Sequence, residues 1–131
     1  MSNFDHEKLE VYQKSIEFVS HATELLERIP RASSIWSQLD RASTSIPLNI
    51  AEGNGKWSAK DRCRFLDVAH GSALECAAAL DVCVAKGSLE RSRATAEKET
   101  LAGIVRMLIG LIKANDPERT FGKLRGVGDR E

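Results

Sequence analysis

Apolar residues recur at alternating intervals of three and four along four stretches of this chain, and short segments with turn residues separate the stretches. This spacing places the apolar side chains on one face of a helix and is typical of amphipathic helices that pack together. The alternation of strand and helix patterns that marks a parallel sheet is missing from the sequence. The pattern therefore predicts an all-α protein with four helices.

The first predicted helix runs from about Asp5 to Ile29 and is ended by Pro30, because proline lacks the N–H of a helical hydrogen bond. The second begins near Ala32 and stops at Gly53, where a tight turn is easily formed. The apolar stripe expected on the first helix comprises Leu9, Tyr12, Ile16, Val19, Leu26 and Ile29, with Thr23 in the gap. The stripe expected on the second comprises Trp36, Leu39, Ser43, Ile46 and Ile50.

The third predicted helix has Ser58 as its N-cap and ends at Gly87, and the fourth follows a cap at Ser88 or Ser92 and runs to about Asn115. Asp116-Pro117 closes the fourth helix. The expected core of the third helix comprises Phe65, Leu66, Ala69, Ser72, Ala73, Cys76, Leu80 and Cys83. That of the fourth comprises Ala94, Leu101, Ile104, Val105, Leu108, Leu111 and Ile112.

Short connections favour antiparallel neighbours, so the four helices are expected to form an up-down-up-down antiparallel bundle with a left-handed twist. A chain of 131 residues is the usual size of one domain. We assign residues 1–115 to the bundle and residues 116–131, which mix glycines with charges, to a flexible C-terminal tail.

The charge balance changes the functional picture, because Lys+Arg and Asp+Glu are equal at 19 each. Many nucleic-acid-binding domains carry a strong positive field, so any such binding here must come from a local patch. The N-terminal residues do not resemble a signal peptide, and no uninterrupted apolar run reaches the length of a membrane span. We expect a cytoplasmic protein with no membrane association.

Motifs for catalysis are weak in this sequence. Asp67 and His70 form a single approximate Asp-x-x-His pair, with no second copy of the kind a di-metal bundle needs. The cysteines are spaced too widely for a zinc site and are expected to be free core thiols. We therefore expect no enzyme activity, cofactor, metal or small-molecule substrate, and rank a metal-dependent oxidase as a distant alternative.

A basic cluster with one aromatic residue lies between the second and third predicted helices. Cations beside an aromatic ring suit phosphate contact combined with base stacking, so the cluster is a candidate nucleic-acid patch. The alternative is a solvated helix start with Trp57 packed as a lid. The cluster comprises Lys56, Trp57, Lys60, Arg62 and Arg64.

A second candidate motif lies in the second helix, where Pro47 predicts a kink. Its polar groups can form a hydrogen-bonded network between helices or subunits, and a structural role is favoured over a ligand site. If its charges are buried, Arg41→Ala or Glu52→Ala weakens folding or assembly. The motif comprises Arg41, Ser45, Pro47, Asn49, Glu52 and Gly53.

The segment QLDRASTSIPLNIAEG at 38–53, with SAKDRCRFLDVAHGSALE at 58–75 and LEVYQKS at 9–15, resembles the four-helix bundle family of proteins encoded within 23S rRNA intervening sequences. The resemblance covers about residues 5–113. It implies a homo-pentamer of bundles. The family is also similar to the accessory variability determinant of diversity-generating retroelements, a pentamer that binds a reverse transcriptase and nucleic acid.

These observations predict a non-enzymatic, homo-oligomeric and pentameric scaffold or adaptor. Its expected partners are itself and RNA, DNA or a nucleic-acid enzyme such as a reverse transcriptase. The alternative is a purely structural or regulatory protein–protein interaction module without nucleic-acid binding, which charge neutrality favours.

Overall fold

The computed structural model describes residues 3–121 of the chain and contains one short 3-10 helix and four α-helices within that range, with no strand. The 3-10 helix η1 spans Asp5–Lys8, and the α-helices are α1 (Glu10–Leu26), α2 (Ser34–Asn54), α3 (Ala59–Ala85) and α4 (Arg91–Asn115). The prediction of an all-α protein with four helices is confirmed. The antiparallel order and the left-handed twist of the bundle stay predictions.

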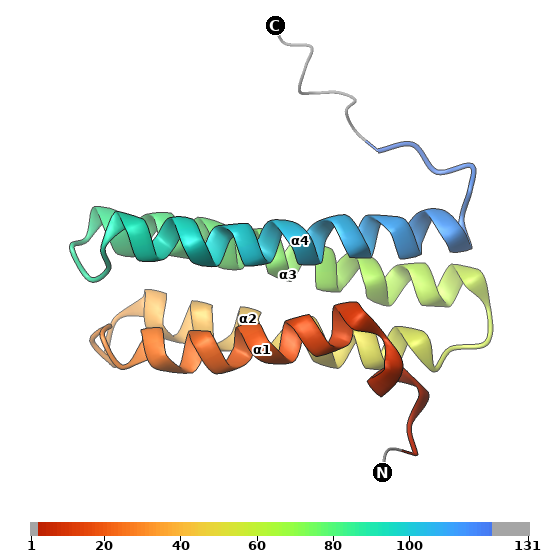
Figure 1. Ribbon diagram of the computed structural model, residues 1–131, viewed down its shortest axis with the longest axis horizontal. Helices are drawn as coiled ribbons and strands as arrows, with labels where there is room; N and C mark the ends of the chain where they lie inside the picture. Colours follow the sequence, from red (N-terminus) through yellow and green to blue (C-terminus); the bar gives the residue numbers. More distant parts are fainter. Residues whose placement is uncertain (1–2, 122–131) are drawn as a thin grey trace, which may run out of the picture.

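The four α-helices surround one core, in which each contacts two neighbours. Contacts join α1 to α2, α2 to α3, α3 to α4 and α4 back to α1, and those between α2 and α3 are the most extensive. Figure 1 shows α1 and α2 in one layer and α3 and α4 in the other. The α2–α3 turn, the start of α1 and the end of α4 lie at the same end of the molecule (Figure 1).

The core is made of the apolar faces that the helices turn toward one another. On α2, α3 and α4 the buried residues match most of the predicted stripes, although Trp36, Phe65, Val105 and Leu111 are only partly buried. The largest fully buried side chains are Phe18, Leu25, Leu39, Ile46, Ile50, Leu80, Leu101, Ile104, Leu108 and Ile112.

The predicted stripe of the first helix is correct only at its end, where Leu26 and Ile29 are buried, and from Tyr12 to Thr23 the buried face lies one residue earlier than predicted. Ile16 lies 45% exposed, and the buried face of α1 is centred on Phe18. This face includes Ser15, whose hydroxyl donates to the carbonyl of Tyr12 at 2.7 Å and is thereby satisfied inside the core. Its buried residues are Val11, Ser15, Phe18, Ala22, Leu25 and Leu26.

The predicted helix from Asp5 to Ile29 is also shorter than expected. Leu9 has an extended backbone, with φ −77° and ψ 128°, and separates η1 from α1. η1 is held at the end of α2, where Asn54 Nδ2 donates to Asp5 Oδ2 at 3.1 Å. At the other end, the residues from Glu27 to Ile29 form turns rather than helix.

The helix ends follow the predicted signals in part. Ser58 caps α3 by accepting the N–H of Asp61 at 3.1 Å, and Gly87, with φ 81°, follows its C-terminus. The expected cap at Ser88 or Ser92 is wrong, because α4 begins after Glu90 without a side-chain cap. Residues 122–131 of the predicted tail lie outside the described residues, so its flexibility stays a prediction.

The helix α3 is long and apolar enough to cross a membrane by length and composition. Its most apolar 18-residue window has a mean hydropathy of 1.4, and 39% of that window is buried inside the molecule. A core helix of a soluble protein has the same properties, and α3 carries core residues from Cys63 to Cys83. The window by itself is therefore weak evidence for a membrane.

Candidate partner-binding surface

The turn between α2 and α3 presents an aromatic residue to solvent. Trp57 is 97% exposed, so the expectation that it packs as a lid on the turn is wrong for the single chain, whereas a solvated helix start is compatible with this exposure. The turn itself is held by the N–H of Lys56, which donates to the carbonyl of Gly53 at 3.1 Å, and by the Ser58 cap. The backbone is thus fixed while the indole ring remains free for contact.

Two cations of the predicted patch lie against one aromatic ring. Lys56 Nζ is 5.0 Å and Arg64 Cζ 4.7 Å from the ring centroid of Phe65, both within the range of a cation–π contact. Each also has a nearby carboxylate: Lys56 Nζ lies 3.9 Å from Glu52 and Arg64 Nη2 3.4 Å from Asp61. These positive charges are held in place but partly neutralised.

The remaining two cations of the patch behave differently. Lys60 is exposed and has no ion-pair or hydrogen-bond partner among residues 3–121. Arg62 is half-buried, and its Nε donates to the carbonyl of Lys56 at 2.8 Å. Arg62 therefore braces the turn, and the surface available to a partner is formed by Lys56, Trp57, Lys60 and Arg64.

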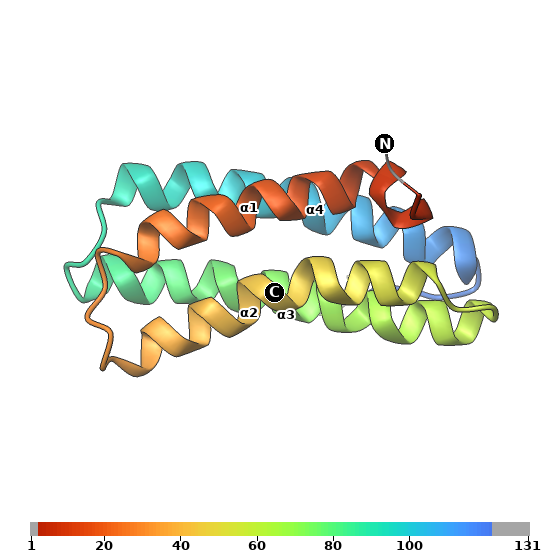
Figure 2. The ribbon, with the colours of Figure 1, turned by 90° about the horizontal axis from the view of Figure 1, so that it is seen from below.

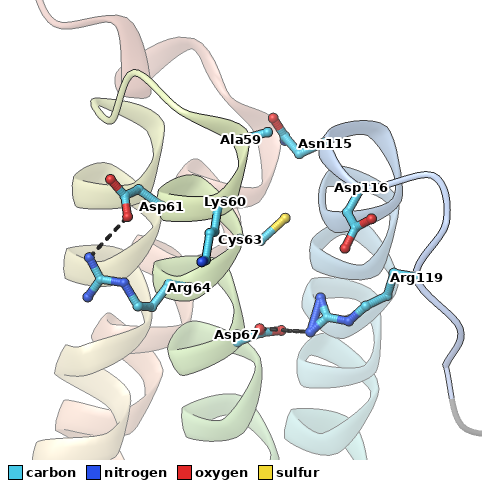
Figure 3. Close-up of a pocket in the computed structure, with 9 residues that line it drawn as sticks. All are labelled: Ala59, Lys60, Asp61, Cys63, Arg64, Asp67, Asn115, Asp116 and Arg119. Atoms are coloured by element: carbon cyan, nitrogen blue, oxygen red, sulfur yellow. Dashed lines mark hydrogen bonds and ion pairs between the residues drawn. The ribbon is translucent and has the colours of Figure 1, made fainter.

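A cavity of about 600 Å³ lies beside this surface, between the start of α3 and the end of α4. Figure 3 shows Lys60, Asp61 and Arg64 on one side and Asn115, Asp116 and Arg119 on the other. Arg119 closes one edge, with Nη2 at 2.7 Å from Asp67 Oδ2. Because acidic and basic side chains alternate around it, the cavity is no dedicated anion site.

The polar motif of α2 links this helix to α3. Asn49 Nδ2 donates to Ser45 Oγ at 2.9 Å, and the hydroxyl of Ser72 on α3 donates to the same oxygen at 2.8 Å. Pro47 is buried inside α2. Figure 2 shows the axis of α2 changing direction about midway along the helix, in the part that contains this motif.

Gly53 allows α2 and α3 to approach closely at the end of the motif. A Cβ on this buried residue would lie 3.0 Å from Phe65 Cβ and 3.2 Å from the backbone oxygen of Arg62. Both neighbours are poorly able to move, because one is a Cβ atom and the other is part of a helix. Glycine is therefore needed here for space.

Arg41 and Glu52, the charged residues of the motif, lie on the surface, so the condition that their charges are buried is not met in the single chain. Arg41 and Glu75 are 3.7 Å apart, with exposed side-chain fractions of 67% and 46%. The Glu52 side chain is 55% exposed and lies 3.9 Å from Lys56. In the single chain, ion pairs of this kind contribute at most about 1 kcal/mol to folding.

One buried charge cluster was missed by the sequence analysis. Glu97 on α4 is 5% exposed, with Oε2 accepting from Arg93 Nε at 2.8 Å and Oε1 lying 2.9 Å from His21 Nδ1 of α1. Arg93 also reaches Glu24 of α1 at 3.3 Å. The hydrogen bond with Glu97 raises the pKa of Arg93 above its ordinary value. The only sequence signal was the arginine four residues before a glutamate, which is common on exposed helices.

Side chains for metal or nucleophilic chemistry do not converge in the described part of the chain. Within residues 3–121 no group of three or more His, Cys, Asp or Glu is placed to hold a metal. Asp67 is engaged by Arg119 rather than by His70. The cysteines are free and buried, and burial raises the pKa of the Cys76 thiol to about 12.

Comparisons with known proteins agree on one family. The family model described as 23S rRNA-intervening sequence protein matches residues 7–110. The fold is similar to the crystal structure of a protein of unknown function from the S23 ribosomal protein family of Bacteroides thetaiotaomicron, with a TM-score of 0.74 and 25% identity over 79% of this chain and 98% of that one. No curated protein matches the chain.

Proposed function

Because the chain belongs to the family of 23S rRNA-intervening sequence proteins, we propose that it is a non-enzymatic, homo-oligomeric scaffold whose α2–α3 turn binds nucleic acid. The proposed assembly is a pentamer of up-down-up-down antiparallel bundles with a left-handed twist, in the cytoplasm and away from membranes. Each copy would present one α2–α3 turn, so the oligomer would offer several equivalent contacts to one extended partner.

The observation that supports nucleic-acid binding is the exposure of Trp57 beside the unpaired Lys60. An exposed indole at a braced turn offers a stacking platform for an unpaired base, and base stacking on aromatic side chains contributes about 1–3 kcal/mol per base. Lys56 and Arg64, held on the ring of Phe65, add positive charge along the same surface. Single-stranded RNA or DNA fits this combination, because its bases are accessible.

Titration of fluorescently labelled single-stranded RNA and DNA at two salt concentrations tests the proposal. Binding should weaken steeply with salt because phosphate contacts release counterions. Trp57→Ala should weaken binding about tenfold or more, and Lys60→Ala should also reduce the salt dependence. Lys86→Ala is the matched control, because Lys86 is an exposed lysine that follows the other end of α3. Absence of binding at low salt would exclude this function.

A protein–protein interaction module without nucleic-acid binding is the second candidate. It is favoured by the equal numbers of acidic and basic residues. It is also favoured by the contacts that two of the cations make within the chain, since Arg62 donates to the carbonyl of Lys56 and Arg64 pairs with Asp61. A nucleic-acid enzyme such as a reverse transcriptase is the partner to test for this module. Salt-independent binding of such an enzyme, lost in Trp57→Ala and without any binding of free RNA or DNA, would support this second function.

A further inference from the structure

Another cavity lies at the end of the bundle where η1, the α2–α3 turn and the end of α4 meet (Figure 1). Its volume is about 260 Å³, and we call it the end pocket. Buried Ile50 and Leu66 form part of its apolar wall. A few convergent polar groups on an apolar wall are typical of ligand sites. Here η1, α2, α3 and α4 each supply one polar side chain, namely Asp5, Asn54, Arg62 and Asn115.

The polar side chains of the end pocket have hydrogen-bonding capacity that the described chain does not use. Arg62 donates through Nε to the carbonyl of Lys56, and its two Nη groups have no partner among residues 3–121. Asp5 accepts from Asn54 through Oδ2, while its Oδ1 accepts nothing from that range. Asn115 donates Nδ2 to a carbonyl of α4, and its Oδ1 is likewise open to a donor from outside the described chain. A double donor and two acceptors therefore line one cavity.

The charges of the end pocket indicate what kind of ligand it can hold. Arg62 and Asp5 line the same cavity with opposite charges, yet within residues 3–121 they form no ion pair with each other. A phosphate group would suit Arg62 but would be repelled by the carboxylate of Asp5 and the amide oxygen of Asn115. A neutral molecule that accepts hydrogen bonds at one edge and donates them at another meets no such repulsion.

From these groups we propose that the end pocket binds one guanine base of the single strand that contacts the α2–α3 turn. Guanine presents O6 and N7 as a pair of acceptors, which an arginine contacts with two N–H groups, and its N2 amino group donates. The two Nη groups of Arg62 contact O6 and N7, and Asp5 accepts from N2. Adenine has a donor in place of O6, and cytosine and uracil have no N7 beside their exocyclic group, so they fit this set of groups less well.

Arg62 connects the end pocket to the surface that is proposed to stack bases. It lines the pocket, and its Nε holds the carbonyl of Lys56, the residue before Trp57. Nearby nucleotides of one strand can therefore reach both places. The inference rests on the proposed nucleic-acid binding and adds a base preference to it. Stacking on Trp57 tolerates any base, so the preference comes from the pocket.

Fluorescence titration of labelled single-stranded RNA tests the contact of Arg62. An oligouridylate is compared with the same strand carrying one central guanosine. The guanosine should strengthen binding about tenfold, since a bidentate arginine contact gives discrimination of this order. Replacing it by 7-deazaguanosine, which has no N7 acceptor, should remove most of the gain. This replacement leaves the protein unaltered, and with it the hydrogen bond by which Arg62 also holds the turn.

Inosine, which lacks the N2 amino group of guanosine, tests the contact of Asp5. The wild-type protein should bind the inosine strand several-fold more weakly than the guanosine strand, whereas Asp5→Ala should bind the two equally. Asp5 is exposed, so this variant should retain the helical circular dichroism spectrum and cooperative melting. Asp40→Ala is the matched control, because Asp40 is an exposed aspartate in the first half of α2. It should preserve the difference between guanosine and inosine.

The outcomes separate the pocket from the proposed function. Equal binding of the oligouridylate and the guanosine strand would overturn the assignment of the end pocket and leave nucleic-acid binding by the turn standing. A gain that 7-deazaguanosine preserves in full, or an inosine effect that Asp5→Ala does not remove, would also overturn the assignment. Absence of binding by every strand at low salt would overturn the nucleic-acid function as well.

Discussion

The contacts of α2 with α3 and of α1 with α4 hold the same bundle together by different means. α2 and α3 share the most extensive interface, with Gly53 against Phe65 and the hydroxyls of Ser45 and Ser72 joined at 2.8 Å. α1 and α4 share the least extensive one, and it contains the buried carboxylate of Glu97. Both interfaces contain residues of the apolar core, but the polar contacts of the first are small neutral groups at close range and those of the second are charged groups.

The two interfaces should respond differently when a substitution removes one side chain of a hydrogen-bonded or ion-paired couple. A hydroxyl that loses its partner retains a modest desolvation cost, about 1–3 kcal/mol. A buried carboxylate that loses its cation leaves an unpaired charge, which costs about 3–5 kcal/mol. The α1–α4 interface should therefore be the more sensitive of the two to single substitutions, although it is the smaller.

The largest effect is expected for Arg93→Ala at the α1–α4 interface. It removes the hydrogen bond from Arg93 Nε to Glu97 Oε2 and leaves the buried carboxylate with His21 alone. Because Arg93 is partly exposed, water can reach the site, and we expect a loss of about 3 kcal/mol in the free energy of unfolding measured in urea. Glu24→Ala is the control, since it removes only the exposed partner of Arg93 and should cost less than about 1 kcal/mol. Equal losses in the free energy of unfolding for Arg93→Ala and Glu24→Ala would show that Glu97 does not carry a buried negative charge that depends on Arg93.

Gly53→Ala should give the next largest effect, at the α2–α3 interface. The added methyl group would lie 3.0 Å from Phe65 Cβ and would force the two helices apart, with a cost of about 1–3 kcal/mol. Gly110→Ala is the matched control: it adds the same methyl group inside α4, where nothing lies within 4 Å, and should stabilise the protein by about 0.5–1 kcal/mol. Thermal melting of both variants shows whether each substitution lowers or raises the melting temperature. A stabilised Gly53→Ala variant would contradict the close approach of α2 and α3.

Ser72→Ala should have a smaller effect at the same interface. It removes the donor to Ser45 Oγ, but that oxygen still accepts from Asn49, so no buried group becomes fully unpaired. We expect a cost of about 1 kcal/mol in chemical denaturation. A loss as large as that of Arg93→Ala would mean that the neutral network is as sensitive as the charged one, which would remove the contrast between the two interfaces.

Arg41→Ala should have the smallest effect on folding of the single chain. Arg41 and Glu75 are both exposed and 3.7 Å apart, so their ion pair should contribute less than about 0.5 kcal/mol. Denaturation at low and high salt provides the measurement, since a surface pair is screened by salt. A large, salt-independent loss would show that the pair is buried, for example inside an oligomer.

Much of the fold was predictable from local signals in the sequence. The periodicity of α2, α3 and α4 identified most of their buried residues. Large apolar side chains mark one face of α2 and of α4, whereas the buried face of α3 is marked mainly by alanines and cysteines at helical spacing. The Ser58 cap and Gly87 were predictable because each acts within a few residues of its own position. On α1 the same method placed Leu26 and Ile29 correctly but missed Phe18, because the buried face includes Ser15 and Ala22 and the exposed face carries Ile16. On α1 the apolar residues Tyr12, Ile16 and Val19 form a stripe beside the buried one, and the periodicity alone did not separate the two.

For the candidate surface, the sequence by itself determined which residue types meet at the α2–α3 turn, and the tertiary structure decided what each one does. Neighbours in sequence diverged there: Trp57 is exposed, Arg62 turns to the carbonyl of Lys56, and Lys60 stays unpaired. Glu97 looked like an ordinary surface residue until the packing of α1 on α4 buried it beside His21. Helix formation depends on contacts within a few residues, so sequence determines it. Burial and ion pairing depend on residues up to 76 positions apart, and only the folded chain brings those together.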